Sequence, residues 1–373
     1  MTTLPAIDES RYADLFLTNT PLIDVRAPVE FDAGAFPTAV NLPLMNDDER
    51  HQVGKRYKAN GQDAAIALGN KLVSGELKQN RIAAWQAFAS KHPHGALYCF
   101  RGGLRSRTSQ SWLSDAGINY PLISGGYKAL RRFLIESLDK WVPTLPAIVV
   151  GGRTGTGKTR VLDACDRALD LEKFANHRGS SFGANLSAQP TNIGFENSLA
   201  IEYLKLVAEA DDRAIVLEDE ARMIGRVSLP EILRQTLGAS PIVILDVAFE
   251  ERIQNVLEDY VIDLCASYQS RDGKSGGLTA FYDHHRNAIL RVQKRLGGEN
   301  TKQILDLLES AYKTLSEQSD VSGFEPYIAF LLHRYYDPMY DYQISAKQER
   351  IRFHGNTEAV IDWISQNNGR HEF

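Results

Sequence analysis

Residues 147–159 read Ala-Ile-Val-Val-Gly-Gly-Arg-Thr-Gly-Thr-Gly-Lys-Thr. The first four residues form an apolar run that predicts a buried strand. The stretch from Gly152 to Thr159 matches the P-loop pattern G-x-x-x-x-G-K-[ST] at every fixed position, and this pattern joins a strand to a helix. Its glycines let successive N–H groups face a phosphate, while Lys158 can neutralise the terminal oxygens and Thr159 can hold Mg²⁺. The predicted phosphate-binding residues are Gly152, Gly155, Gly157, Lys158 and Thr159.

Two more apolar runs follow this loop, at residues 214–217 and 241–245. Strands separated by helical stretches predict a parallel sheet with crossover helices, so the fold class is α/β. A P-loop is expected to have an acidic partner after a neighbouring strand. Glu218 and Glu220 fit that position best and Asp246 fits it less well, although acids there are often simply solvated. The helix after the loop is expected to pass through Val161, Leu162, Cys165 and Leu169.

The length of 373 residues suits two or three domains. Pro143 and Pro146 separate two structured stretches and indicate a boundary. The expected domains are an N-terminal α/β domain at residues 1–136, a central P-loop parallel-sheet domain at residues 137–250, and a mainly helical C-terminal region at residues 251–373 that packs on the P-loop domain. In this last region β-type patterns fade and the Gly-rich stretch 272–277 interrupts the helical pattern.

A second candidate site lies in residues 97–107, which read Leu-Tyr-Cys-Phe-Arg-Gly-Gly-Leu-Arg-Ser-Arg. Cys99 ends an apolar strand, two glycines follow it, and a helix is expected from about Ser106. Such a loop aims backbone N–H groups at an anion, and Arg101 and Arg105 add positive charge. Both features favour the thiolate, which is the nucleophilic form of cysteine. The predicted catalytic residues are Cys99, Arg101 and Arg105.

Three stretches accompany this loop: Asp-Val-Arg at residues 24–26, Asn-Leu-Pro at 41–43 and Ser-Gly-Gly-Tyr at 124–127. With the cysteine loop they resemble the rhodanese family, whose cysteine carries persulfide or perselenide. The N-terminal domain is therefore expected to be rhodanese-like. The spacing Cys-x5-Arg is one residue longer than in common sulfurtransferases, and cysteine phosphatases share the longer spacing. A rhodanese-fold cysteine phosphatase with a nucleotide-binding module, or a non-catalytic P-loop regulator, stays open as an alternative.

The bulk composition excludes several classes of protein. The chain is 43% hydrophobic without an apolar run long enough to span a membrane, and its first residues lack a signal-peptide pattern, so cytoplasm is the expected location. Three widely spaced cysteines do not suggest a disulfide framework, and Cys165 is expected in the core. The net charge of −5 argues against a globally basic nucleic-acid coat but permits a local basic groove.

A P-loop domain directly after a rhodanese-like domain is an unusual pairing. Further stretches accompany it, at residues 48–54, 177–183, 189–191, 218–225 and 335–340. Together they resemble the tRNA 2-selenouridine synthase family along nearly the whole chain. The resemblance implies a transferase that replaces the sulfur of wobble 2-thiouridine by selenium. It implies two substrates besides tRNA, namely geranyl diphosphate, which forms an S-geranyl intermediate, and selenophosphate, which delivers selenium. No tightly bound cofactor is expected, Mg²⁺ is an optional companion of the diphosphate, and no residue is firmly assigned to a metal.

The tRNA partner, through its anticodon stem-loop, requires basic and aromatic contacts, and the chain is expected to be a monomer or weak oligomer. Candidate phosphate contacts are Arg101, Arg105, Arg107, Lys128, Arg131, Arg132, Arg286, Arg291, Lys294 and Arg295, although each could lie on an ordinary solvated helix face. The tyrosines of residues 335–340 could stack a flipped base or pack in a core. Candidate substrate or Mg²⁺ contacts are Arg178, Ser180, Ser181, Glu218, Glu220 and Arg222, with His177 in the same loop as the first three.

Overall fold

The computed structural model describes residues 4–368, so the ends of the first and third expected domains lie outside the described residues. The chain forms two compact units. The N-terminal unit comprises residues up to Trp141 together with Pro190–Asp211, and the C-terminal unit comprises Val142–Gln189 with the residues from Asp212 onward. No helix within residues 4–368 combines the length and apolar character needed to cross a bilayer.

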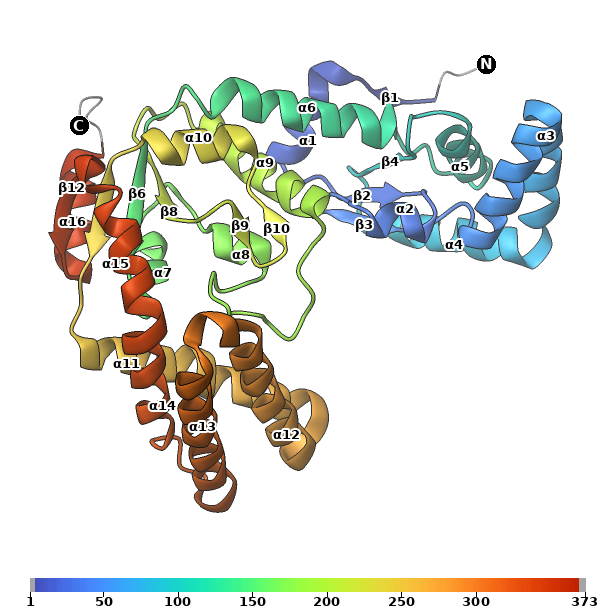
Figure 1. The fold of residues 1–373 in the computed structure, drawn as a ribbon. Coiled ribbons are helices and arrows are strands. Elements are labelled where there is room, and N and C mark those ends of the chain that lie inside the picture. Colours follow the sequence, from blue (N-terminus) through green and yellow to red (C-terminus); the bar gives the residue numbers. More distant parts are fainter. Residues whose placement is uncertain (1–3, 369–373) are drawn as a thin grey trace. The chain divides into compact units, whose positions relative to one another are not determined.

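The N-terminal unit is built on a five-stranded parallel sheet with the strand order β1-β5-β4-β2-β3 (Figure 1). Its strands are β1 (Ala6–Ile7), β2 (Leu22–Asp24), β3 (Ala39–Asn41), β4 (Ala96–Tyr98) and β5 (Leu122–Ile123). Its helices are α1 (Tyr12–Leu17), α2 (Pro28–Asp32), α3 (Asp47–Leu72), α4 (Gly75–Lys91), α5 (Leu104–Asp115), α6 (Gly126–Trp141) and α9 (Asn192–Ala208). The carboxyl ends of parallel strands share one edge, so the loop after β4, which carries Cys99, opens at that edge.

The C-terminal unit contains a second five-stranded parallel sheet, in the order β12-β11-β6-β8-β7, and a small antiparallel hairpin. The sheet strands are β6 (Ala147–Gly152), β7 (Ala168–Leu169), β8 (Ile215–Glu218), β11 (Ile242–Leu245) and β12 (Ile351–Gly355), and the hairpin strands are β9 (Met223–Ile224) and β10 (Val227–Ser228). Near the sheet lie α7 (Lys158–Asp163), α8 (Leu171–Ala175), α10 (Glu231–Ala239) and α16 (Thr357–Asn367). The α/β class with parallel sheets is therefore confirmed.

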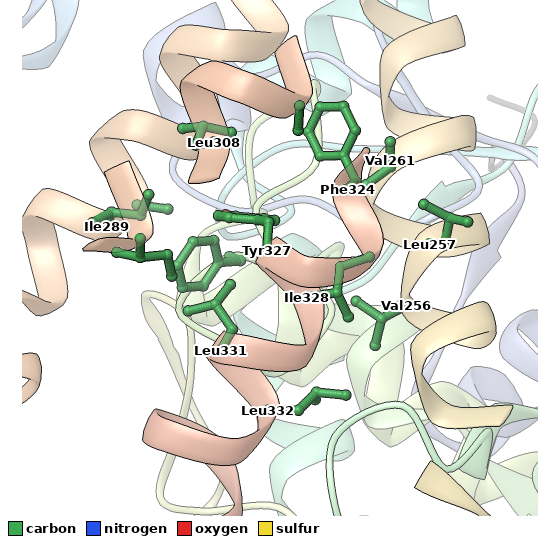
Figure 2. Close-up of a cluster of buried hydrophobic side chains, with 14 of the residues drawn as sticks. Val256, Leu257, Val261, Ile289, Leu308, Phe324, Tyr327, Ile328, Leu331 and Leu332 are labelled. Carbon is green, nitrogen blue, oxygen red and sulfur yellow. The ribbon is translucent and has the colours of Figure 1, made fainter. Parts of the chain in front are cut away.

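The remaining helices of this unit form a separate apolar cluster. They are α11 (Phe249–Leu257), α12 (Asp263–Leu296), α13 (Gly298–Gln318), α14 (Phe324–Leu331) and α15 (Asp337–Ser345), with π-helical turns at Glu258–Ile262 and Leu332–Tyr336. Figure 2 shows Phe324, Tyr327 and Leu331 of α14 among side chains from α11 and from the helices α12 and α13. As expected, the Gly-rich stretch breaks the regular helix, because Gly273 has a φ of 76° inside α12.

Three elements differ from the sequence-based expectation. Helix α9 lies in the predicted P-loop domain by sequence but packs against α1 and α6 of the N-terminal unit. Strand β12 follows a long helical region, yet it pairs with β11 at the edge of the P-loop sheet. The helix after the P-loop ends at Asp163 instead of continuing through Leu169, because Ala168 and Leu169 pair with β8 as an edge strand. Cys165 is consequently half-buried beside the sheet core.

Candidate functional site

The P-loop connects the end of β6, at Gly152, to the start of α7, at Lys158. Gly155 and Gly157 have φ angles of 82° and 80°, which favour glycine. A Cβ atom on Gly155 would also lie 2.7 Å from the carbonyl oxygen of Arg252 on α11. The glycines therefore shape the loop and allow α11 to approach it closely.

Two side chains of α11 donate hydrogen bonds to backbone carbonyls of this loop. Arg252 donates through Nε to the carbonyl of Thr154 at 2.9 Å, and Asn255 donates to the carbonyl of Gly155 at 2.8 Å. The other guanidinium nitrogens of Arg252 contact Asp337 at 3.1 and 2.6 Å. The sequence assigned no role to these three side chains, because they follow the motif by about a hundred residues or more, and Asp337 was noted only as part of the stretch 335–340.

The loop opens into a pocket with a volume of about 390 Å³. Thr159, Arg178 and Ser180 line this pocket together with the P-loop. Thr154 and His177 also belong to the lining residues, and Oγ1 of Thr154 and Nδ1 of His177 are buried without a hydrogen-bond partner among residues 4–368.

Carboxylates face the lysine of this pocket. Candidate metal-ligand atoms of Glu172, Glu218 and Glu220 all lie within 4.8 Å of one another. Burial raises the pKa of Glu218 well above its ordinary value, and Glu172 adds to the effect. Burial and Glu172 likewise raise the pKa of Glu220 to about 8. For Lys158 burial alone would lower the pKa, but Tyr340, Glu172 and the other two carboxylates raise it, so this lysine stays protonated.

The alternation of side chains along a strand decides which acids join this cluster. Glu218 and Glu220 point to the P-loop side, whereas Asp219 between them accepts from Lys347 at 2.6 Å. Asp246 follows β11 on the other side of β6 and lies 3.5 Å from His354. Sequence analysis named Glu218 and Glu220 but missed Glu172, which follows the short edge strand β7.

The remaining predicted contacts of this unit divide into two groups. Arg178 and Ser180 lie in the pocket wall, and Arg178 also forms ion-pair contacts with Asp259 and Asp263 at 3.8 Å. Ser181 turns away and lies 3.4 Å from the hydroxyl of Tyr335. Arg222 is exposed, next to the β9–β10 hairpin, and is not among the side chains that line the pocket.

The tyrosines of residues 335–340 lie in two different environments. Tyr335 and Tyr336 are buried in the helical cluster, so core packing accounts for them. Tyr340 lines the P-loop pocket, and its ring centroid lies 5.9 Å from Nζ of Lys158.

Cys99 follows β4 in the N-terminal unit and lines a cleft of about 750 Å³. Its Sγ atom lies 3.2 Å from the hydroxyl of Ser106, which itself donates to the carbonyl of Gly103. The carbonyl of Cys99 accepts from the N–H of Tyr127. A Cβ atom on Gly126 would lie only 2.2 Å from that carbonyl, which explains the glycine in the predicted Ser-Gly-Gly-Tyr stretch.

The arginines around Cys99 differ in their partners. Arg105 forms a bidentate ion pair with Glu30, and Arg50 also contacts Glu30 at 3.0 Å. Burial alone would raise the pKa of Glu30, but bonding to Arg105 holds it below the ordinary value. Much of the positive charge of Arg105 is therefore balanced, whereas Arg101 is exposed at the cleft.

Comparisons with known proteins identify one family, through a family model and through full-length relatives. The family model described as "tRNA 2-selenouridine synthase AAA domain" matches residues 145–371. A protein from Marinobacter nauticus named tRNA 2-selenouridine synthase is 51% identical over 95% of this chain and 97% of its own length. A protein of the same name from Bordetella petrii is 49% identical over 96% of both chains. The chain belongs to the tRNA 2-selenouridine synthase family.

A solved structure also shows similarity to this member of the tRNA 2-selenouridine synthase family. It is the N-terminal domain of a putative ATP/GTP-binding protein from Clostridium difficile 630, which is 32% identical over 35% of this chain and 98% of that chain, with a TM-score of 0.32.

The basic residues predicted to contact RNA occupy two regions of this family member. On the N-terminal unit, Arg107, Lys128 and Arg132 are exposed, but Arg131 is part-buried and bonds to Glu196 and Asn197 of α9. On α12 of the C-terminal unit the four predicted cations are exposed, namely Arg286, Arg291, Lys294 and Arg295. Arg131 is better explained as an anchor for α9.

Proposed function

We propose that this chain is a tRNA 2-selenouridine synthase, a transferase that exchanges the sulfur of wobble 2-thiouridine for selenium. The observation that carries the proposal is near half identity, over almost the full length, to proteins of that name. The two sites supply complementary chemistry. One has a buried cysteine at the end of a strand, and the other has a lysine in a glycine-rich anion loop.

The P-loop pocket is proposed to bind geranyl diphosphate for the first step. The thiocarbonyl sulfur of the nucleoside attacks the first carbon of the geranyl group, the carbon–oxygen bond breaks, and N3 of the base loses its proton. Diphosphate leaves with the bonding electrons. Lys158 and the N–H groups of Gly155–Thr159 would stabilise that developing charge. Mg²⁺ would suit the oxygen ligands of Thr159 and the Glu172–Glu218–Glu220 cluster, where it would neutralise diphosphate charge.

The Cys99 loop, in a rhodanese-like unit, is proposed to handle selenium in the second step. Selenium from selenophosphate adds to C2 of the base and the C2–S bond breaks, so geranylthiol leaves with a proton. Water cleaves the selenium–phosphorus bond and releases phosphate, and no oxidant or reductant is needed. Arg101, exposed at the cleft, would attract the selenophosphate anion. Ser106 could rotate its hydroxyl to donate to the Cys99 thiolate.

The cysteine-phosphatase alternative finds less support in this cleft. Such an enzyme needs a protonated acid near the cysteine to release the leaving group. Among residues 4–368, Glu30 is the carboxylic acid that lines the cleft, and its pKa is held below the ordinary value by Arg105 against the effect of burial. It would therefore be a poor proton donor at neutral pH. The proposed setting is a cytoplasmic monomer or weak oligomer without a tightly bound cofactor.

The two sites can be tested separately by mass spectrometry of nucleosides after incubation with 2-thiouridine tRNA, geranyl diphosphate and selenophosphate. The Cys99→Ala variant should lose selenouridine formation and still form S-geranyl-2-thiouridine. The Lys158→Ala variant should lose most geranylation. Matched controls are Cys165→Ala and Lys313→Ala, which change residues outside both pockets. If the Cys99→Ala variant kept selenation but lost geranylation, the proposed assignment of geranylation to the P-loop and of selenium transfer to the Cys99 loop would be wrong.

A further inference from the structure

A second, larger hollow lies beside the Cys99 cleft in the N-terminal unit, with a volume of about 880 Å³. Its floor is apolar and includes Met45, Ala65, Val73 and Trp112. Met45, Ala65 and Val73 are buried, and Met45 and Val73 belong to the apolar core of the N-terminal unit. Trp112 packs against that core. None of these residues has a part in the proposed chemistry, so the hollow is not explained by the sites described above.

Helix α3 forms one wall of the hollow because it bends back on itself. Gly61 has a φ of 82° and a ψ of −175°, which divides α3 into two helical segments. A Cβ atom on Gly69 in the second segment would lie 3.8 Å from Cγ2 of Val53 in the first. The two segments therefore pack side by side, and both contribute to the lining.

The rim of the hollow is basic. His51, Lys55 and Lys58 occur at helical spacing on the first segment of α3 and line the hollow, as does Tyr57, whose side chain is 57% exposed. Arg56, which is exposed on the same segment, is not among the lining residues. An apolar floor beneath a cationic rim suits a ligand that combines a hydrocarbon chain with phosphate groups.

The hollow adjoins the Cys99 cleft. Arg50, Leu104 and Arg105 line both spaces. Leu104 is the first residue of α5, directly before Arg105, and is 51% exposed. A base whose C2 atom is near Cys99 could thus extend a substituent past Leu104 into the hollow.

From this arrangement we propose that the hollow binds the hydrocarbon chain of an S-alkylated wobble nucleoside, while its rim contacts phosphates of the same RNA. This inference rests on the proposed function, because it requires the S-geranyl intermediate. The hollow would be a recognition site for the second step, in which the geranyl group leaves as geranylthiol. Burial of a C10 chain favours the alkylated RNA over its thiouridine precursor.

Another apolar pocket, lined by residues between Thr154 and Tyr336, suits the hydrocarbon chain less well. It lies behind the P-loop between Thr154 and helices of the apolar cluster, and its free volume is only about 20 Å³. The hollow beside Cys99 has far more space and is next to the reacting cysteine.

Binding of synthetic anticodon stem-loops to the full chain tests the proposal. The probes carry S-geranyl- or S-methyl-2-thiouridine at the wobble position, and fluorescence anisotropy gives each dissociation constant. The wild-type protein should bind the geranyl form about tenfold or more tightly. Ala65→Phe fills the hollow and should bring the ratio close to one. Ala67→Phe, the same change at an exposed position of the same helix, should keep the ratio.

The rim is tested with the same probes. The double variant Lys55→Glu/Lys58→Glu should weaken binding of both RNAs equally and reduce the salt dependence. Arg56→Glu should have a smaller effect. A double variant that binds both RNAs as tightly as the wild type would remove the rim from the proposal.

Photocrosslinking of the wild-type protein covers the case in which Ala65→Phe fails to fold. An S-alkyl chain ending in a diazirine should label peptides within residues 44–73 or 104–112. Labelling confined to residues 256–336, or an unchanged geranyl preference in folded Ala65→Phe, would overturn the site. A wild-type protein that forms no S-geranyl or selenium product would instead refute the proposed function, whatever its binding preference.

Discussion

The carboxyl group of Glu220 titrates in the neutral range, because burial and Glu172 raise its pKa from 4.5 to about 8. The folded state therefore holds a proton that the unfolded state releases, and stability should fall as pH rises from about 4.5 to 8. Glu220→Gln should flatten this part of the stability profile, measured by thermal unfolding across pH. Glu231→Gln should leave it unchanged, since the pKa of exposed Glu231 is lowered by Arg234. If the stability of Glu220→Gln fell as steeply with pH as that of the wild type, Glu220 would not be the group responsible.

Gly126 shows how a single residue shapes the cysteine loop. A side chain there would collide with the carbonyl of Cys99 at a position with a φ of 60°. We expect Gly126→Ala to destabilise the N-terminal unit by roughly 1–3 kcal/mol and to change the rate at which iodoacetamide alkylates Cys99. Gly103→Ala is the control, because a Cβ atom there meets no atom within 4 Å. Urea denaturation and peptide mapping measure the two effects, and similar results for both variants would refute the explanation.

At the scale of elements, α11 links the P-loop to α15. Arg252 on α11 bonds to the carbonyl of Thr154 and to Asp337, and its side chain is only 4% exposed. Arg252→Ala leaves Asp337 without this ion-pair partner. We therefore expect the free energy of unfolding to fall by about 3 kcal/mol and inorganic diphosphate to bind more weakly. Urea denaturation and calorimetric titration test this. Arg234→Ala removes an exposed ion pair and should cost less than about 1 kcal/mol, and an equal cost for both would argue against the link.

At the scale of the whole molecule, each of the two units has apolar clusters of its own among residues 4–368. Phe324 is fully buried in the helical cluster (Figure 2). Its ring contacts those of Phe281 and Tyr327 edge-on. Phe324→Ala should lower the stability of the C-terminal unit by about 3–5 kcal/mol and leave the N-terminal unit protected in hydrogen-exchange measurements. Leu113→Ala in the other core should give the reverse pattern. Simultaneous loss of protection in both units, in both variants, would mean that they unfold as one.

Local patterns were sufficient to predict much of this protein. The strand before the P-loop and the one before Cys99 were visible as short apolar runs, and both parallel sheets contain them. The P-loop itself was recognisable because its residues are contiguous. Glu218 and Glu220 were also predicted from a local pattern, because they lie at and just after the end of an apolar strand. Acids in that position are placed at the edge of the sheet where the P-loop opens.

Other features depended on tertiary structure, because they join segments that are distant in sequence. Glu172 completes the carboxylate cluster only when β7 pairs beside β8. Strand β12 is predictable only from its pairing with β11, and α9 packs with the N-terminal unit although its sequence lies within the other unit. The sequence alone determined the P-loop motif, the candidate cysteine loop and the α/β class, since a few adjacent side chains specify each of them. Folding decided which acids, arginines and apolar walls surround those loops, because packing and ion pairing act between residues that no local pattern connects.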